Sequence, residues 1–323
     1  MALPRLERPF ELGEPWQVTA IDQEAPTSTN EVSKWEQFTW GICEKQLLNK
    51  LGTKKKRIVY IYPLRDRYLL GGLYRVFSHY FSDKISPNCL SYKKGVKTLT
   101  AIEYLLSDKD IFNKYGVKLD ISAYFNSVSE TYLRKILDEL MIGEDELKRV
   151  LHDLFFDNTV IYKGRLIQEF KSLIPGTSLS SFFANFCLKD LDNYIVNKLG
   201  ITYARYSDDI IFFADTIEEL KVGLQKVSEK LAELGLKINE NKYEWFKPGD
   251  EITYLGLKIQ GDKIDISKNS AKKFKKKIKH ACVLGRNEIE FEGKDPYKVA
   301  RKILKRYNHR VYKCYIQDKS KFG

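Results

Sequence analysis

Short apolar runs that are rich in β-branched and aromatic residues recur along the chain and predict β-strands. Residues 58–62 and 117–121 each form one such run. Residues 203–214 hold two runs separated by a polar step from Ser207 to Asp209, which is the pattern of a β-hairpin. Two further hairpins are predicted, one over residues 160–167 with its turn at Lys163-Gly164, and one pairing strands 252–259 and 264–266 around Gly261-Asp262.

Apolar residues spaced three and four apart predict helices between these strands. The first, at residues 31–51, rests on Ser33 as a cap and on the spacing of Trp40, Cys43, Leu47 and Leu51. The other predicted helices cover residues 65–81, 129–141, 145–156, 179–199 and 216–234.

The last part of the chain predicts two strongly basic helices. The first, from about residue 267, surrounds a narrow apolar line of Phe274, Ile278 and Cys282 with lysines. The second begins near Pro296, and its predicted inward positions are Val299, Ile303, Tyr307, Val311 and Tyr315.

Two adjacent aspartates, Asp208 and Asp209, lie at the predicted tip of the hairpin over residues 203–214. A tight turn keeps both carboxylates out of the core, and two neighbouring like charges are stabilised by a divalent cation. Aspartate is also a common turn residue, so a solvated Asp-Asp turn is the alternative interpretation.

The charge balance indicates a polyanionic partner. The chain has 323 residues and a formal net charge of +12, with an ordinary hydrophobic content of 43%. This length supports a large core and two or three subdomains. A basic surface favours nucleic acid as the partner, and a merely soluble basic protein is the alternative.

The five cysteines are far apart, form no CxxC pair and accompany only four histidines, so neither a zinc site nor a disulfide framework is predicted. We find no signal peptide and no apolar stretch long enough to span a bilayer. We therefore expect no membrane partner and a reducing compartment, most simply the cytoplasm.

A series of motifs resembles the reverse transcriptase family over roughly residues 55–260. Tyr206-Ser207-Asp208-Asp209 resembles its YxDD box, and residues 118–125, around Asp120, resemble its first aspartate motif. The remaining similar blocks, all in the family's order, are Arg57 to Arg67 (RxxxIPxxxDR), Gly176 to Asn185 (QGxxxSPxxAN), residues 236–239 with Lys242, and residues 254–257.

Some positions depart from the family pattern. Pro175 stands where the family has glutamine, and Ser181 stands where it has proline. The segment from Ser91 to Gly95 resembles the family's SYxFRxG block but is shorter and lacks its arginine. Divergent bacterial lineages that resemble abortive-infection and other phage-defence reverse transcriptases share the missing glutamine.

The resemblance implies an α+β fold of the right-hand polymerase type, with fingers, a palm whose antiparallel sheet carries the YSDD hairpin, and a small helical thumb. We expect an N-terminal extension and helix at residues 1–50, a fingers and palm domain at 51–260, and a basic thumb at 261–323.

The resemblance assigns two Mg²⁺ ions, with Mn²⁺ as a substitute, to Asp120, Ile121, Asp208 and Asp209. Magnesium prefers carboxylates, water and phosphates as ligands, which suits two-metal phosphoryl transfer. A helix N-cap is the alternative role for Asp120. The family also implies that Lys242 protonates the departing pyrophosphate, and an exposed turn lysine is the alternative.

For the incoming nucleotide, the resemblance implies a site formed by Arg57, Phe125, Gly176 and Tyr206. An arginine suits the triphosphate because its guanidinium bonds two phosphate oxygens at once. Phe125 would be the steric gate that rejects a 2′-hydroxyl, and a core aromatic residue is the alternative.

For nucleic acid, the family implies template contacts by Arg67, and the thumb would bind the duplex through its lysines. Those proposed are Lys272, Lys273, Lys276 and Lys277. A solvated helix face is the alternative for this lysine cluster.

The predicted activity is that of an RNA-directed DNA polymerase, in a bacterial antiviral defence system or a retroelement. Its partners would be an RNA template, the DNA product and deoxynucleoside triphosphates; a cognate non-coding RNA and an oligomeric state stay open. The missing Val-Thr-Gly thumb signature disfavours a retron. Template-independent or protein-primed DNA synthesis and a catalytically vestigial RNA-binding protein are the alternatives.

Overall fold

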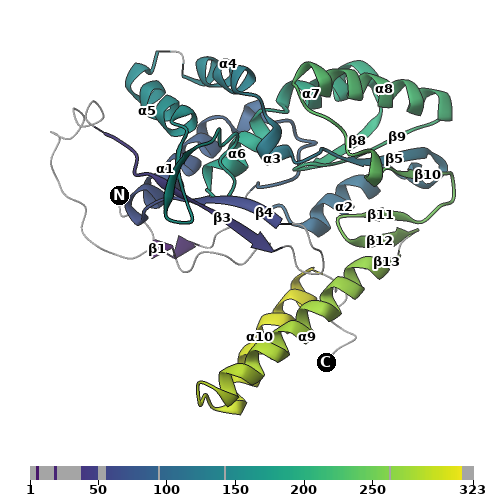
Figure 1. Ribbon diagram of the computed structural model, residues 1–323. Helices are drawn as coiled ribbons and strands as arrows, with labels where there is room; N and C mark the ends of the chain where they lie inside the picture. Colours follow the sequence, from purple (N-terminus) through teal and green to yellow (C-terminus); the bar gives the residue numbers. More distant parts are fainter. Residues whose placement is uncertain are drawn as a thin grey trace.

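The computed structural model describes residues 5–6, 18–19, 38–49, 56–93, 95–141, 143–261 and 263–314. It consists of a mixed α/β body and a pair of helices that projects from it (Figure 1). The only described parts of the first 37 residues are two short paired strands, β1 (Arg5–Leu6) and β2 (Val18–Thr19), so most of the expected N-terminal extension lies outside the described residues.

The central sheet has the strand order β10-β5-β9-β8 and is antiparallel throughout. Its strands are β5 (Tyr115–Asp120), β8 (Thr202–Tyr206), β9 (Asp209–Ala214) and β10 (Glu244–Phe246). The predicted strand at residues 117–121 and the predicted hairpin are therefore confirmed.

Both faces of this sheet are buried. Along β9, Ile210 and Phe212 face one hydrophobic cluster, whereas Ile211 and Phe213 face another, as expected from the two-residue period of a strand. This explains why β9 reads as a continuous apolar run. Helix α8 (Ile217–Glu233) packs in the first cluster, and α2 (Thr98–Leu106) packs in the second.

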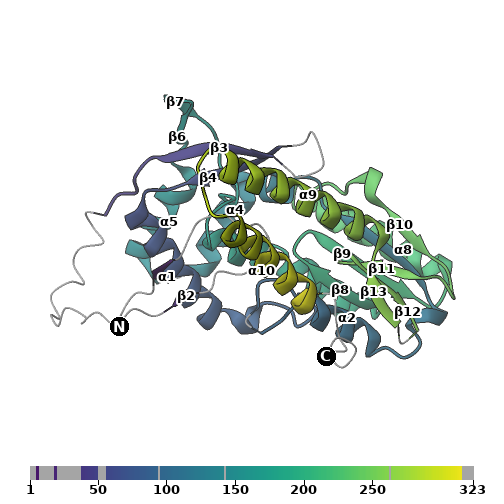
Figure 2. The same cartoon turned by 90° about the horizontal axis from the view of Figure 1, so that it is seen from below.

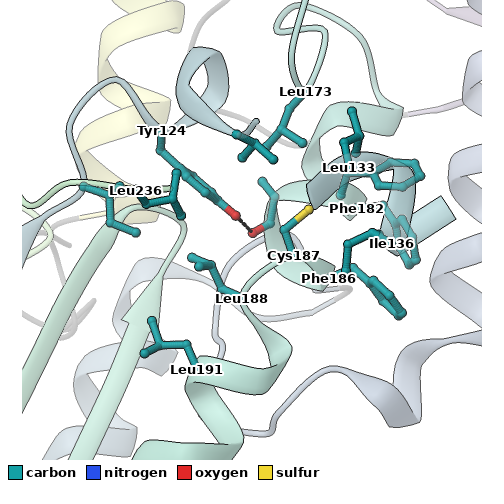
Figure 3. Close-up of a cluster of buried hydrophobic side chains, with 14 of the residues drawn as sticks. Tyr124, Leu133, Ile136, Leu173, Phe182, Phe186, Cys187, Leu188, Leu191 and Leu236 are labelled. Carbon is teal, nitrogen blue, oxygen red and sulfur yellow. Dashed lines mark hydrogen bonds between the residues drawn. The ribbon is translucent and has the colours of Figure 1, made fainter. Parts of the chain in front are cut away.

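The first cluster continues into the helices behind the sheet. These are α3 (Tyr124–Ser127), α4 (Glu130–Leu140), α5 (Asp145–Phe156), α6 (Leu179–Phe186) and α7 (Lys189–Tyr194). Figure 3 shows Tyr124 reaching from α3 towards α6, where its hydroxyl donates to the Ala184 carbonyl oxygen at 2.7 Å. The continuous helix predicted at 179–199 is wrong in detail, because α6 ends at Phe186, α7 follows after two residues, and a π-helical turn (Ile195–Leu199) closes the segment.

A second sheet has the order β4-β3-β6-β7, with β3 (Cys43–Asn49), β4 (Lys56–Ile61), β6 (Thr159–Tyr162) and β7 (Arg165–Gln168). Helix α1 (Leu64–Tyr80) follows β4. The helix predicted at residues 31–51 is wrong over its described part, residues 38–49, which contains the strand β3 and no helix. Six residues of β3 pair with β4, and Cys43 and Glu44 also pair with β6, so partners distant in sequence decide its conformation.

The hairpin predicted around residue 261 is part of a three-stranded meander. Its strands are β11 (Ile252–Tyr254), β12 (Leu257–Gln260) and β13 (Lys263–Ile266). The single strand predicted at 252–259 is wrong, because the chain reverses at Leu255 and Gly256, which have φ angles of 50° and 83°. Asp262, part of the second predicted turn, lies outside the described residues.

The projecting helical pair comprises α9 (Lys268–Glu290) and α10 (Pro296–Cys314), which run side by side in both views (Figures 1 and 2). They meet closely at Gly285, where an added Cβ would lie 2.9 Å from Val299 and 2.8 Å from Ile303. Phe274 packs edge-on against Tyr307 at 5.7 Å. Cys282 was expected to face inward but is exposed. The residue of α9 that packs against α10 in this region is the small Gly285.

Two of the predicted inward positions, the side chain of Val311 and the whole of Tyr315, lie outside the described residues. Across the described part of the chain, no helix is both long and apolar enough to cross a bilayer.

Candidate active site

The hairpin turn brings three carboxylates to one edge of the central sheet. Asp120, the last residue of β5, lies directly opposite Asp209, the first residue of β9. The Ile121 amide donates to the Asp208 carbonyl oxygen at 3.1 Å, which fixes the turn against the end of β5. The structure therefore brings Asp120, Asp208 and Asp209 together; we call them the carboxylate trio.

Burial and mutual repulsion disfavour ionisation in this trio. Burial raises the pKa of the Asp209 carboxyl to about 6, and the charges of Asp208 and Asp120 act in the same direction. The pKa of Asp208 is also raised, by burial and by Asp120. Two carboxyls with raised pKa values at a sheet edge are typical of a site that binds a cation or performs proton chemistry.

Lys242 provides a positive charge at the trio. It lies in the short 3₁₀ turn Glu240–Lys242, and its Nζ is 2.7 Å from Oδ1 of Asp120. The Nδ2 atom of Asn239 donates to Oδ2 of Asp120 at 3.3 Å, so both oxygens are engaged. The Lys242 side chain is about half exposed in this turn, so an exposed turn lysine stays the alternative to its predicted role.

The trio has the donor chemistry that Mg²⁺ requires, since hard oxygen ligands repel one another until a cation is present. Within the described residues, however, no group of three or more His, Cys, Asp or Glu side chains is drawn together tightly enough to hold a metal ion. These side chains fit a metal by their chemistry. Because Lys242 bonds Asp120 in this arrangement, they would have to move to close around a metal ion.

A buried ion pair lies under the hairpin turn and was not identified from the sequence. Arg205 and Asp192 are both fully buried, with the Arg205 Nη2 2.6 Å and Nε 2.7 Å from the two carboxylate oxygens. The Nη1 atom of Arg205 donates to the Ser207 carbonyl oxygen at 3.1 Å. The hydroxyl of Tyr203 also donates to Asp192, at 2.6 Å.

A second set of polar side chains holds the turn from the same side. The Ser207 amide donates to Oγ of Ser91 at 2.9 Å, and Ser91 donates to Oδ1 of Asn185 at 2.8 Å. Tyr92 contacts the Ser207 hydroxyl at 3.4 Å. Ser207 itself has a φ of 62°, a left-handed backbone conformation that is unfavourable for any residue other than glycine. These hydrogen bonds therefore stabilise a turn that is unfavourable by itself.

The meander also contacts the trio. The hydroxyl of Tyr254, which is completely buried, donates to the Asp209 carbonyl oxygen at 3.2 Å. Lys118 on β5 donates to the Thr253 carbonyl oxygen at 2.7 Å and pairs with Glu244. These bonds couple the position of β11 to the edge that carries the trio.

The predicted nucleotide residues lie in different environments. Phe125 and Tyr206 are partly buried, each against one of the two clusters. Arg57 is exposed on β4. Burial raises the pKa of the Tyr92 hydroxyl, and the charge of Arg57 acts in the opposite direction. Gly176 has a φ of 103° and packs on β4, where an added Cβ would lie 2.9 Å from Val59. The backbone conformation and the close packing therefore require glycine here, independently of the predicted role at the nucleotide.

Arg67 is partly buried on α1, and its Nε is buried with no hydrogen-bond partner among the described residues. Among the four thumb lysines, Lys272, Lys273 and Lys276 are exposed, whereas Lys277 is half-buried. Only Lys273 lines the depression of about 480 Å³ at the junction of α9 with the meander. Its other basic lining residues are Lys118, Lys258 and Lys268.

Comparison with known proteins gives a single consistent result. The profile of the family described as "Reverse transcriptase (RNA-dependent DNA polymerase)" matches residues 49–259. The retron Ec73 reverse transcriptase of Escherichia coli is 29% identical over 148 residues, which are 41% of this chain and 43% of that protein. The retron Ec48 reverse transcriptase of the same species is 24% identical over 183 residues, or 49% and 42% of the two chains. The match thus spans less than half of either relative.

Solved telomerase structures share the fold. The apo telomerase of Candida tropicalis superimposes with a TM-score of 0.57 and 13% identity, covering 88% of this chain and 59% of that one. Telomerase of Candida albicans with a fragment of telomeric RNA gives 0.55 and 14%, covering 87% and 56%. The predicted right-hand polymerase fold is confirmed. Both of these relatives are retron proteins, whereas the missing Val-Thr-Gly thumb signature had led us to expect another lineage.

Proposed function

The chain belongs to the reverse transcriptase (RNA-dependent DNA polymerase) family, and on that premise we propose that it copies an RNA template into DNA from deoxynucleoside triphosphates. The observation that carries this proposal is the register of Asp120 opposite Asp209, with Asp208 in the turn beside them. A vestigial protein has no need to keep three repelling carboxyls at a sheet edge, which disfavours the RNA-binding alternative.

The trio is proposed to hold two divalent ions, Mg²⁺ or Mn²⁺ in its place, with the Ile121 backbone beside them. Bound ions would supply the positive charge that activates the primer 3′-hydroxyl and neutralises the phosphates of the nucleotide. The protein's own contribution is positioning and preorganised charge, as in other phosphoryl transfers. Arg205, Ser91 and Tyr254 hold the backbone of the hairpin in place, so only side chains would have to move when the ions bind.

The nucleotide is proposed to lie between the trio and the second sheet. Exposed Arg57 would bind the triphosphate, while Phe125 and Tyr206 would lie near the sugar and base. Lys242 would lose its contact with Asp120 and become available to protonate the leaving pyrophosphate. Arg67, which is partly buried on α1, would contact the template.

The Candida albicans telomerase structure contains a fragment of telomeric RNA, and for this chain we propose an RNA template. The further proposals are a cytoplasmic location, a role in bacterial antiviral defence or a retroelement, and the division at residues 50 and 260. Template-independent or protein-primed synthesis by the same trio is the second candidate, since Pro175 departs from the family's glutamine.

The test is to sequence the nucleic acid that copurifies with the protein together with any DNA made on adding deoxynucleotides. A product complementary to the copurified RNA supports templated synthesis. A homopolymer, or a product covalently attached to protein, supports the second candidate instead.

A further inference from the structure

Lys242 reaches the carboxylate trio from a segment that is already fixed against Asp120. The Asn239 amide donates to the Asp120 carbonyl oxygen at 2.8 Å, and the Lys242 amide donates to the Asn239 carbonyl oxygen at 2.9 Å. Two residues further along the chain from Asp120, the Ser122 amide donates to the Lys237 carbonyl oxygen at 2.8 Å. Backbone bonds, and not only a flexible side chain, therefore set where the ammonium lies.

The two partners differ in exposure. The Asp120 side chain is 11% exposed and the Lys242 side chain 54%. The ammonium group therefore covers one side of the carboxylate, while much of the lysine side chain stays in solvent. An ammonium held this way can leave without disturbing the core. Its charge also acts on Asp208 and Asp209, opposing their mutual repulsion.

These contacts bear on how a metal ion can reach the trio. One of its three carboxylates has both oxygens committed, one to Lys242 and one to Asn239. A metal ion that needs Asp120 as a ligand must compete with an ammonium at 2.7 Å.

We propose that Lys242 is a tethered counter-ion that takes the place of a metal ion at Asp120, and that the metal binds only by displacing it. This role rests on the proposed function, and it is separate from protonation of the pyrophosphate. It makes metal affinity depend on the incoming nucleotide, because the triphosphate offers the displaced ammonium another anion. The site would then bind metal weakly until substrate arrives.

The test is Mn²⁺ binding followed by electron paramagnetic resonance, on the full chain without nucleic acid or nucleotide. Lys242→Met removes the competing charge and should bind Mn²⁺ about two- to fivefold more tightly, the range expected for losing an ion pair with one solvent-exposed partner. Lys242→Arg keeps the charge and should retain parental affinity. Lys237→Met, an exposed lysine on the same segment, is the matched control and should change nothing.

A second readout is the melting temperature. Without metal, Lys242→Met should melt lower than the parent because the trio loses its counter-ion, and saturating Mn²⁺ should stabilise it by more than it stabilises the parent. Equal or weaker Mn²⁺ binding by Lys242→Met overturns the inference. Unchanged Mn²⁺ binding by Asp120→Asn overturns the proposed metal site instead, so the two failures are distinguishable.

Discussion

At the scale of single residues, Arg205 shows best what the sequence leaves hidden. It lies three positions before the first aspartate of the turn, and an arginine in a strand is expected to reach solvent. In the structure it is fully buried because Asp192, thirteen residues earlier, neutralises it. No local pattern pairs these two residues, so the sequence does not predict that the turn rests on an ion pair.

We predict that Arg205→Met destabilises the fold by about 3–5 kcal/mol, because it leaves the Asp192 charge buried and unpaired. The double variant Arg205→Met/Asp192→Leu should recover most of that loss, yet its incorporation rate should stay low since Ser207 has lost its hydrogen bond. Urea unfolding and single-nucleotide incorporation measure the two effects. Lys226→Met, which breaks a surface pair with Glu229, is the control and should leave both unchanged.

If the double variant is as active as the parent, Arg205 serves stability alone. If it remains as unstable as the single variant, the ion pair does not account for the loss.

The raised pKa of Asp209 gives a second residue-scale prediction. The carboxyl has an ordinary pKa of 3.8 and a folded pKa of about 6, so the folded state binds more protons between these values. The metal-free protein should therefore lose stability as the pH rises from about 4 to about 6, by up to about 3 kcal/mol. Asp209→Asn should flatten this part of the profile and be the more stable protein at pH 8.

Urea unfolding in a chelating buffer across this pH range measures the profile. Asp83→Asn, at an exposed aspartate outside the site, should keep the parental shape. If Asp209→Asn keeps the parental dependence of stability on pH, the pKa of this carboxyl is not raised in the folded protein.

At the scale of elements, the sequence predicts the helices and strands whose conformation is set by residues within or next to them. The helices predicted from residues 129 and 216 are confirmed, and in the structure each begins at a side-chain cap, with Thr216 and Glu219 forming a capping box. β3 was mistaken for a helix because its partners β4 and β6 lie elsewhere in the chain. The turn at Leu255 was missed because a leucine with a positive φ has no turn signature.

Helix α9 gives the prediction at this scale. Lys272 and Lys273 are adjacent, so their side chains point about 100° apart on the helix. Only Lys273 lines the depression that also contains Lys118. We predict that Lys273→Gln weakens RNA–DNA duplex binding and makes the slope of log affinity against log salt shallower by roughly 0.7–0.9, the loss of one phosphate contact.

Lys272→Gln is the matched control and should keep the parental salt slope. Equal effects of the two substitutions would show that the whole helix, and not the face towards the meander, follows the duplex.

At the scale of the whole molecule, the site is assembled from segments that are far apart in sequence. Asp120, Asp208 and Lys242 meet because β5 lies between β9 and β10 and the turn after α8 returns to the end of β5. The ordered motifs were enough to predict which residues belong to the trio. They were not enough to predict the contact between Lys242 and Asp120 or the polar support under the turn, because those depend on long-range packing.

The central claim is that the trio exists for catalysis and not for folding. The most direct measurement compares the parent with Asp208→Asn/Asp209→Asn in primer extension on an RNA template, and in metal-free urea unfolding at pH 8 on the same preparations. We predict incorporation at the level of a no-enzyme control, with a free energy of unfolding equal to or above that of the parent. Near-parental incorporation, or a double variant that fails to fold, would contradict the claim.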